Sequence, residues 1–271
     1  MSNARNYERL IAPDGRRVDV VKTLVAERLL DGYIRDPRPD DRPDLSASLP
    51  GKHQGRVALI AATGPSLSSV PLHTLEALVA RENAVVWGVN DVWRSHREGA
   101  LGCDYYVVLD ERYLTTHAEP VLAYLGKFPK CLPCFAFTPD LDLRYYELRI
   151  DMHKTPETDP EYVRSHYWHG LSSGVAAVQM AMHAGCSTIY LIGHDCRAAG
   201  PKTHAFGRRS VDEAKGNYPQ GSRMLDAYAV LSRHAKALGI DVFNLSAISA
   251  IDSFPRLDPV ALAEGRRVPL S

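Results

Sequence analysis

The chain has no excess charge of either sign and no long apolar run. Its 271 residues include 32 basic and 32 acidic side chains, so the formal net charge is zero. Because surfaces that bind DNA or RNA depend on an excess of Lys and Arg, this balance gives no support to a nucleic-acid partner, although a local basic patch is compatible with it. No apolar run reaches the roughly 18 residues that span a bilayer, and no signal peptide is visible, so we expect no membrane insertion.

Cysteine is also scarce, at five residues. The spacing does not match a secreted disulfide framework, so we expect a reducing, cytoplasmic compartment. Cys131-x-x-Cys134 stands without a second pair, and packing beside a strand explains it better than metal or redox chemistry. His166-x-x-His169 has no evident third ligand, so we predict no metal site. The composition, with 45% hydrophobic and 24% charged residues, is that of an ordinary globular protein.

Composition divides the chain into four parts. Residues 1–34 form a small appendage, in which apolar residues at helical spacing predict a helix from Val20 to Asp31. Residues 35–55 begin with a run rich in Pro and Asp, which predicts an extended linker. Residues 56–256 form the main domain, with an irregular insert or lid at 128–168. Residues 257–271 are predicted to be a C-terminal tail.

Buried strands alternate with helices in the main domain. Continuous apolar runs predict strands at 57–62, 84–89, 105–109, 188–192 and 242–245, and shorter strands are expected at 134–137 and 146–150. Helices are predicted at 71–81, from 172 onward, and along the apolar stripe from 224 to 238. This alternation predicts an α/β fold with a doubly wound, mainly parallel, Rossmann-like sheet.

Three short polar segments follow predicted strands or open a predicted helix. Thr63-Gly64-Pro65-Ser66 follows the first strand, Ser172-Ser173-Gly174 opens an apolar helix, and Gly193-His194-Asp195 follows the strand at 188–192. Strand ends and helix starts meet at one edge of an open α/β sheet, where backbone N–H groups can hold an anion. We therefore predict that the three segments line a pocket for a phosphorylated ligand.

Other polar residues join the same edge, and each has a local interpretation as well. Asn90 and Asp110 follow the second and third strands, where an amide and a carboxylate can contact a sugar or phosphate, or simply form turns and caps. Ser66 and Ser172 are equally good helix caps. The first segment lacks the lysine of a Walker A loop and the later glycines of a dinucleotide fingerprint. His204, in a loop rich in Gly and Lys, is either a general base or a surface histidine.

In their order and placement these motifs resemble one superfamily, that of the bacterial CMP-sialic-acid-dependent sialyltransferases and the archaeal-type 6-hydroxymethylpterin diphosphokinases. The chain looks closest to uncharacterised bacteriophage members. The resemblance covers roughly 56–256 and implies a Rossmann-like nucleotide-binding domain with a small lid. By position, the segment Thr63–Ser66 matches the family's first nucleotide-binding loop. Asn90 matches an asparagine that contacts donor phosphate or sugar, and Ser172–Gly174 matches the segment that touches the donor nucleotide.

The resemblance extends to the acidic residues and fails at one histidine. Asp195 matches an acidic residue after a strand, and Asp110 stands where the family has asparagine or aspartate. The sialyltransferases place their catalytic histidine shortly before the last long helix, where this chain reads Tyr218-Pro219-Gln220-Gly221-Ser222. His204 matches a Thr-His element of the phage-type sequences and becomes the substitute candidate.

Three functions follow as hypotheses. The first is a glycosyltransferase that moves a sugar from a nucleotide-activated donor to a hydroxyl acceptor with inversion, using His204 as base and Asp110 or Asp195 to orient sugar or acceptor; it needs no cofactor beyond the donor. The second is diphosphoryl transfer from ATP to a small, pterin-like hydroxymethyl compound, with Mg²⁺ held by Asp110 or Asp195. The third is a non-catalytic nucleotide-binding phage protein whose N-terminal helix binds a partner.

Overall fold

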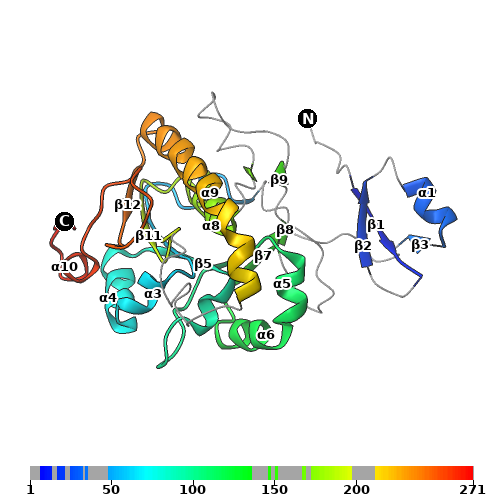
Figure 1. The fold of residues 1–271 in the computed structure, drawn as a ribbon, viewed down its shortest axis with the longest axis horizontal. Coiled ribbons are helices and arrows are strands. Elements are labelled where there is room, and N and C mark those ends of the chain that lie inside the picture. The colour runs from blue at the N-terminus through cyan, green and yellow to red at the C-terminus, as the bar shows by residue number, and fades with distance from the viewer. Residues whose placement is uncertain are drawn as a thin grey trace.

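The computed structural model describes most of the chain. The described residues are 7–13, 17–21, 25–32, 34–35, 48–135, 146–147, 150–151, 167–168, 172–196 and 211–270, with side chains in the last range placed from 224 onward. They form a small N-terminal unit and an α/β body (Figure 1).

The N-terminal unit is built mainly from strands. β1 (Tyr7–Ile11) pairs in antiparallel fashion with β2 (Arg17–Val21) and with β3 (Ile34–Arg35). A short helix, α1 (Val25–Leu30), lies between β2 and β3. The helix predicted from Val20 is therefore shorter than expected, because Val20 and Val21 belong to a strand that pairs with β1.

The body contains a seven-stranded sheet in which every neighbouring pair is parallel. Its order is β12-β11-β4-β5-β6-β7-β8. The chain runs outward from β4 to β8 and then returns to place β11 and β12 on the other side of β4, which confirms the predicted doubly wound, Rossmann-like α/β fold. The strands are β4 (Val57–Ala61), β5 (Val85–Val89), β6 (Tyr105–Val108), β7 (Leu132–Phe135), β8 (Tyr146–Glu147), β11 (Thr188–Ile192) and β12 (Asp241–Asn244). A separate parallel pair joins β9 (Ile150–Asp151) and β10 (Tyr167–Trp168).

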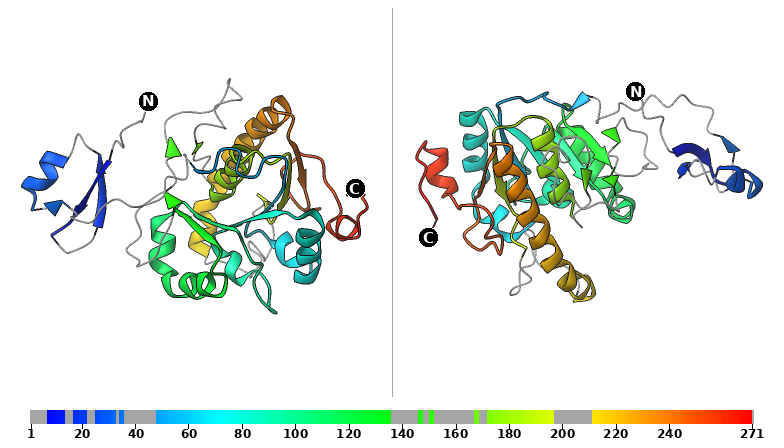
Figure 2. Two further views of the ribbon diagram at one scale, coloured as in Figure 1. Left: turned by 180° about the vertical axis from the view of Figure 1, so that it is seen from behind. Right: turned by 90° about the horizontal axis from the view of Figure 1, so that it is seen from above.

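Helices cover both faces of this sheet. Successive residues of a strand point to opposite faces, so alternate residues are buried in two separate cores. On β4, Ala58 and Ile60 belong to the core shared with α8 and α9, whereas Leu59 and Ala61 belong to the core of the other face. Two further views show α8 and α9 on the same side (Figure 2). The covering elements are α8 (Ser173–His183) and α9 (Val211–Ala237) on one face, and α3 (Pro65–Ser69), α4 (Leu72–Glu82), η2 (Asn90–Arg94), α5 (Glu111–Thr116), α6 (Ala118–Lys127) and α10 (Pro259–Ala263) on the other.

Two segments predicted to lie outside the body contribute to it. Leu49, in the predicted linker, is fully buried, and the backbone N–H of His53 donates to the carbonyl of Ala184 at 2.8 Å. Leu257 and Leu262, in the predicted tail, are buried in the same core as α4. The apolar side chains of both segments explain this, since burying them is favourable. Among the described residues, none of the helices combines the length and apolar character needed to cross a bilayer.

Candidate functional site

The carboxyl ends of β11, β4, β5 and β6 lie side by side, because these strands are neighbours in the sheet. Between β4 and β11 the direction in which strands are added reverses, which makes this the topological switch point. Open α/β sheets bind their ligands outside the carboxyl ends of strands at such a point. The loop after β4 and the start of α3 hold Thr63–Ser66, and the loop after β11 holds Gly193–Asp195, so two predicted segments meet there.

Asp195 connects these two loops. Its side chain is only 3% exposed; Oδ2 accepts a hydrogen bond from the backbone N–H of Ser66 at 2.8 Å, and Oδ1 accepts one from the hydroxyl of Ser246 at 2.6 Å. The hydroxyl of Ser66 in turn accepts from the backbone N–H of Gly193 at 3.0 Å. Both carboxylate oxygens therefore hold protein groups. Asp195 thereby fixes the segment after β4, and its expected contact with sugar, acceptor or Mg²⁺ stays a prediction.

Gly64 is required by the same contacts. Its backbone N–H donates to the carbonyl of Gly193 at 2.8 Å, and a Cβ added to it would lie 2.5 Å from Asp195 Oδ2. The close approach that the structure shows is to the neighbouring loop, and the approach of a ligand to this glycine stays a prediction. Thr63, Gly64 and Pro65 are half-buried, so part of the loop still faces solvent. Pro65 is the first residue of α3, a position where its missing N–H leaves no hydrogen bond unmade.

A second cluster joins the start of α8 to the ends of β5 and β6. The hydroxyl of Ser173 donates to Asn90 Oδ1 at 3.3 Å and accepts from the backbone N–H of Leu109 at 3.2 Å. Asn90 has a φ of 46°, in the left-handed region that asparagine tolerates better than most residues, and its carbonyl accepts from the hydroxyl of Tyr106 at 2.7 Å. The third predicted segment thus reaches the same edge of the sheet.

The N-terminus of α8 carries the partial positive charge of a helix end. Ser172 is its cap, since its hydroxyl accepts from the backbone N–H of Gly174 at 3.1 Å. The first turn contains no acidic residue. The first N–H groups of a helix have no partner within the helix, and together with the aligned peptide dipoles they favour an anion.

A buried histidine and tyrosine pack under this helix start. His194 Nδ1 lies 2.6 Å from the hydroxyl of Tyr228 on α9, and the two rings meet edge to face. Burial lowers the pKa of His194 to about 4, so the ring is neutral at pH 7. A Cβ on Gly174 would lie 3.0 Å from both the His194 ring and the Tyr228 hydroxyl, which explains a glycine inside a helix. The sequence placed Tyr228 only on an apolar stripe and carried no signal for this contact.

Asp91, beside Asn90, is a second residue that the sequence analysis passed over. It is buried; its Oδ1 accepts from the hydroxyl of Tyr113 at 3.0 Å and pairs with Arg94 Nη2 at 2.8 Å. The indole N–H of Trp93 donates to the same hydroxyl at 2.9 Å. Because Tyr113 lies on α5, these contacts connect the turn of Asn90 to the helix that Asp110 caps.

Asp110 is the accessible carboxylate among the predicted site residues. Its side chain is 55% exposed, and Oδ1 accepts from the backbone N–H of Arg112 at 3.0 Å as the cap of α5. His204, the predicted base, lies outside the described residues. Within the described ranges, no three His, Cys, Asp or Glu side chains are grouped as a metal site would require.

Comparison with known proteins gives structural neighbours only. No family model and no curated protein matches the chain. The sialyltransferase CstII from Campylobacter jejuni, solved with the substrate analogue cytidine-5'-monophosphate, is 15% identical with a TM-score of 0.42, over 74% of this chain and 84% of that one. The MAf glycosyltransferase from Magnetospirillum magneticum is 13% identical with a TM-score of 0.47, over 83% of this chain and 41% of that one.

At these identities the likeness concerns the fold alone. The predicted kinship with bacteriophage proteins and with pterin diphosphokinases stays a prediction, since neither structure is of that kind. Function is therefore inferred from the residues at the carboxyl edge of the sheet.

Proposed function

We propose that this protein is a glycosyltransferase that transfers a sugar from a nucleotide-activated donor to a hydroxyl acceptor with inversion. The observation that carries the proposal is the hydrogen-bonded cluster of Ser173, Asn90 and the backbone N–H of Leu109. This cluster holds the start of α8 against the ends of β5 and β6, beside the switch point at β4 and β11. A helix N-terminus in that position is suited to phosphate.

The donor phosphates would bind between the start of α8 and the loop after β4. The first turn of α8 offers backbone N–H groups without a competing acidic residue, and the half-exposed Thr63–Pro65 adds backbone and hydroxyl groups. As the sugar leaves, negative charge builds up on the phosphate oxygen that it was bonded to. Backbone N–H groups that already point towards that oxygen stabilise the transition state without reorganising.

The remaining groups have separate roles in this mechanism. The acceptor oxygen bonds to the anomeric carbon as the bond to the phosphate oxygen breaks, and the acceptor proton passes to a base, for which His204 is our candidate. Asp110, exposed at the end of β6, would orient the sugar or the acceptor. Asp195 acts through Ser66 and is a positioning residue.

The test is a panel of CMP-, UDP- and GDP-activated sugars, with Mg-ATP as a comparison, assayed by calorimetry and by chromatography of the released nucleotide. We expect one class of nucleotide sugar to bind. Ser173→Ala should weaken that binding about tenfold, because it removes the contacts that place α8. Asp110→Asn should lower turnover and leave donor affinity close to that of the wild type.

Ser187→Ala is the matched control, since the hydroxyl of Ser187 is exposed at the opposite edge of the sheet and donates to Gly55. It should leave donor affinity unchanged. The proposal is overturned if no nucleotide sugar binds, or if Ser173→Ala and Ser187→Ala have the same affinity. Binding of Mg-ATP alone would also overturn it and would favour diphosphoryl transfer.

A further inference from the structure

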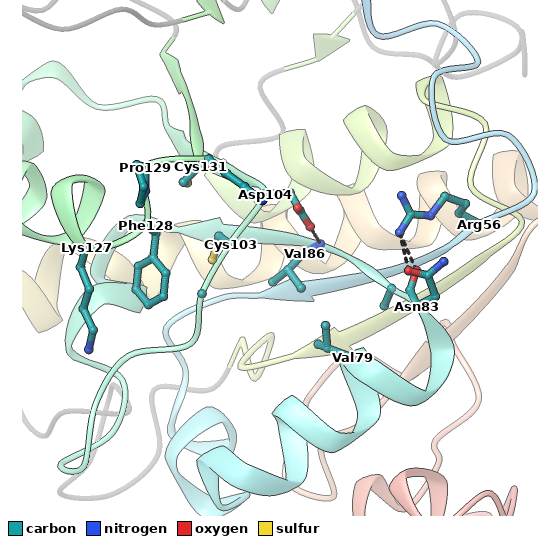
Figure 3. A pocket seen from close by; sticks show the side chains of 13 residues that line it. Arg56, Val79, Asn83, Val86, Cys103, Asp104, Lys127, Phe128, Pro129 and Cys131 are labelled. Atoms are coloured by element: carbon teal, nitrogen blue, oxygen red, sulfur yellow. Dashed lines mark hydrogen bonds between the residues drawn. The ribbon is translucent and has the colours of Figure 1, made fainter.

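A cavity of about 470 Å³ opens at the amino edge of the sheet, at the opposite ends of the strands from the proposed donor site (Figure 3). Arg56 precedes β4, Asp104 precedes β6, and Cys131 precedes β7, so the cavity lies where these strands begin. The end of α4 and the end of α6 form its sides. Its volume falls in the range of small-molecule sites, about 300–1,000 Å³.

The inner surface of this cavity is mainly apolar and includes an aromatic ring. Val79, Val86 and the ring of Phe128 line it, together with the thiol of Cys103 (Figure 3). Burial raises the pKa of Cys103 to about 12, so the thiol is neutral and acts as apolar surface. A Cβ on Gly102 would lie 2.9 Å from the Phe128 ring, so the glycine lets that ring pack against the loop.

The lining carries more positive than negative charge. Arg56, Lys127 and Lys130 stand against a single carboxylate, that of Asp104. Arg56 is already used: its guanidinium donates to the carbonyl of Asn83 at 2.7 Å, where α4 ends. Asp104 is used as well, since its Oδ2 accepts from the backbone N–H of Val86 at 2.8 Å.

The two lysines are therefore the groups available to a ligand. Both are exposed at the rim, and Lys127 Nζ lies 5.6 Å from the centre of the Phe128 ring. An ammonium group beside an apolar wall can pair with an anion whose body rests on that wall. The charges of Arg56 and Asp104 offset each other in the lining, and both groups are bonded to the protein, which leaves the two ammonium groups to pair with the carboxylate of a ligand.

We propose that this cavity binds a small organic anion with one negative charge and a flat apolar body, such as an aromatic carboxylate. The carboxylate would pair with Lys127 and Lys130, and the body would lie against Phe128 and Val79. This site is separate from the proposed donor site and does not depend on the function proposed above.

The test uses benzoate and its neutral counterpart benzamide as probes of the 271-residue chain, and binding is followed by ligand-observed NMR at low ionic strength. We expect benzoate to bind more tightly than benzamide, by about fivefold, because exposed charge pairs contribute modestly. The double variant Lys127→Gln, Lys130→Gln should remove that difference. Lys236→Gln, which deletes an exposed lysine on α9, is the matched control and should retain it.

Two further variants locate the bound probe. Val79→Phe should fill the cavity and weaken both probes, whereas Ser173→Ala, at the other edge of the sheet, should change neither. The proposal is overturned if benzoate does not bind, if the two probes bind equally to the wild type, or if the lysine double variant keeps the wild-type preference. It is also overturned if Ser173→Ala lowers benzoate binding, since the anion would then occupy the carboxyl edge.

Discussion

Replacing Asp195 tests whether this carboxylate holds the site together. In Asp195→Ala, the backbone N–H of Ser66 and the hydroxyl of Ser246 lose their acceptor while both residues stay buried. A buried donor without a partner costs about 1–3 kcal/mol, so the loss of both contacts should lower the free energy of unfolding by about 3 kcal/mol. The affected loops are those on which the proposed donor site is built.

Asp195→Asn should be much milder. The amide has the shape of the carboxylate; its oxygen can still accept from the N–H of Ser66, and its NH₂ group can donate to the Ser246 hydroxyl, which can rotate to accept. Only the advantage of a charged acceptor is lost, which costs about 1 kcal/mol. Both variants remove the negative charge, but only Asp195→Ala removes the hydrogen bonds. The difference between their free energies of unfolding therefore measures the hydrogen bonds and not the loss of charge.

Urea unfolding followed by circular dichroism measures both effects. With a slope of about 3 kcal/mol per molar urea, Asp195→Ala should lower the midpoint by about 1 M and Asp195→Asn by about a third of that. Asp226→Ala, at an exposed position on α9, is the control and should shift the free energy by less than about 0.5 kcal/mol. A midpoint for Asp195→Ala equal to that of the control would refute the proposal that the hydrogen bonds of Asp195 stabilise these loops.

Three further predictions concern buried groups. Burial lowers the pKa of His194 from 6.5 to about 4, so between these pH values the unfolded chain binds a proton and the folded chain does not. This difference contributes about 3 kcal/mol to the free energy of unfolding. The contribution is complete above about pH 6.5 and should be lost as the pH falls to 4. Urea midpoints across that range should show this slope, and an unchanged slope in His194→Gln would assign it to other groups. Gly174→Ala should lower the melting temperature by about 2–4 °C, because crowding against Tyr228 outweighs the gain in helix propensity; a higher temperature in calorimetry would contradict this. Cys103, 8% exposed and with its pKa raised to about 12, should react with Ellman's reagent much more slowly in the native protein than after unfolding; the assay uses Cys196→Ser, because Cys196 is partly exposed, and reaction of that native variant as fast as that of the unfolded chain would contradict the burial of Cys103.

The central strands were predictable because burial on both faces leaves continuous apolar runs. The run at 57–62 became β4 at Val57–Ala61, and the run at 188–192 became β11 with the same bounds. The strand expected at 134–137 lies two residues earlier, as β7, because the parallel ladder with β6 pairs Leu132 with Tyr105. Prolines at this edge made its register hard to predict, since they weaken the strand pattern.

The strands of the N-terminal unit were not predicted, for a different reason. Val18 and Val20 alternate with polar residues, as in a half-buried strand, but Val21 also fits the helical stripe that continues to Leu29. Short apolar patterns of this kind suit both structures, and the pairing with β1 decides between them.

The rule that strand ends meet at one edge predicted that Ser66, Asn90, Ser173 and Asp195 lie on the same side of the sheet. The structure joins them as two pairs, Ser66 with Asp195 and Ser173 with Asn90, and their roles toward a ligand stay predictions. A sequence does not reveal whether a carboxylate after a strand faces solvent or a neighbouring N–H group. Asp110 and Asp195 each follow a strand within three residues, yet Asp195 is buried and Asp110 is exposed.

The hydrogen bond between the backbone N–H of Ser66 and Asp195 Oδ2 joins residues that are 129 positions apart in the chain. During synthesis on the ribosome, β4 emerges long before its partner β11. Until β11 is made, the backbone N–H and C=O groups on one edge of this apolar strand have no strand to pair with. Contacts between residues this distant in sequence form slowly. In the meantime the unpaired edge of β4 can pair with another chain and aggregate, or bind a chaperone. A nascent or cleaved fragment that stops before residue 188 would thus retain five of the seven strands, β4 to β8, and lack the β11 side of the switch point.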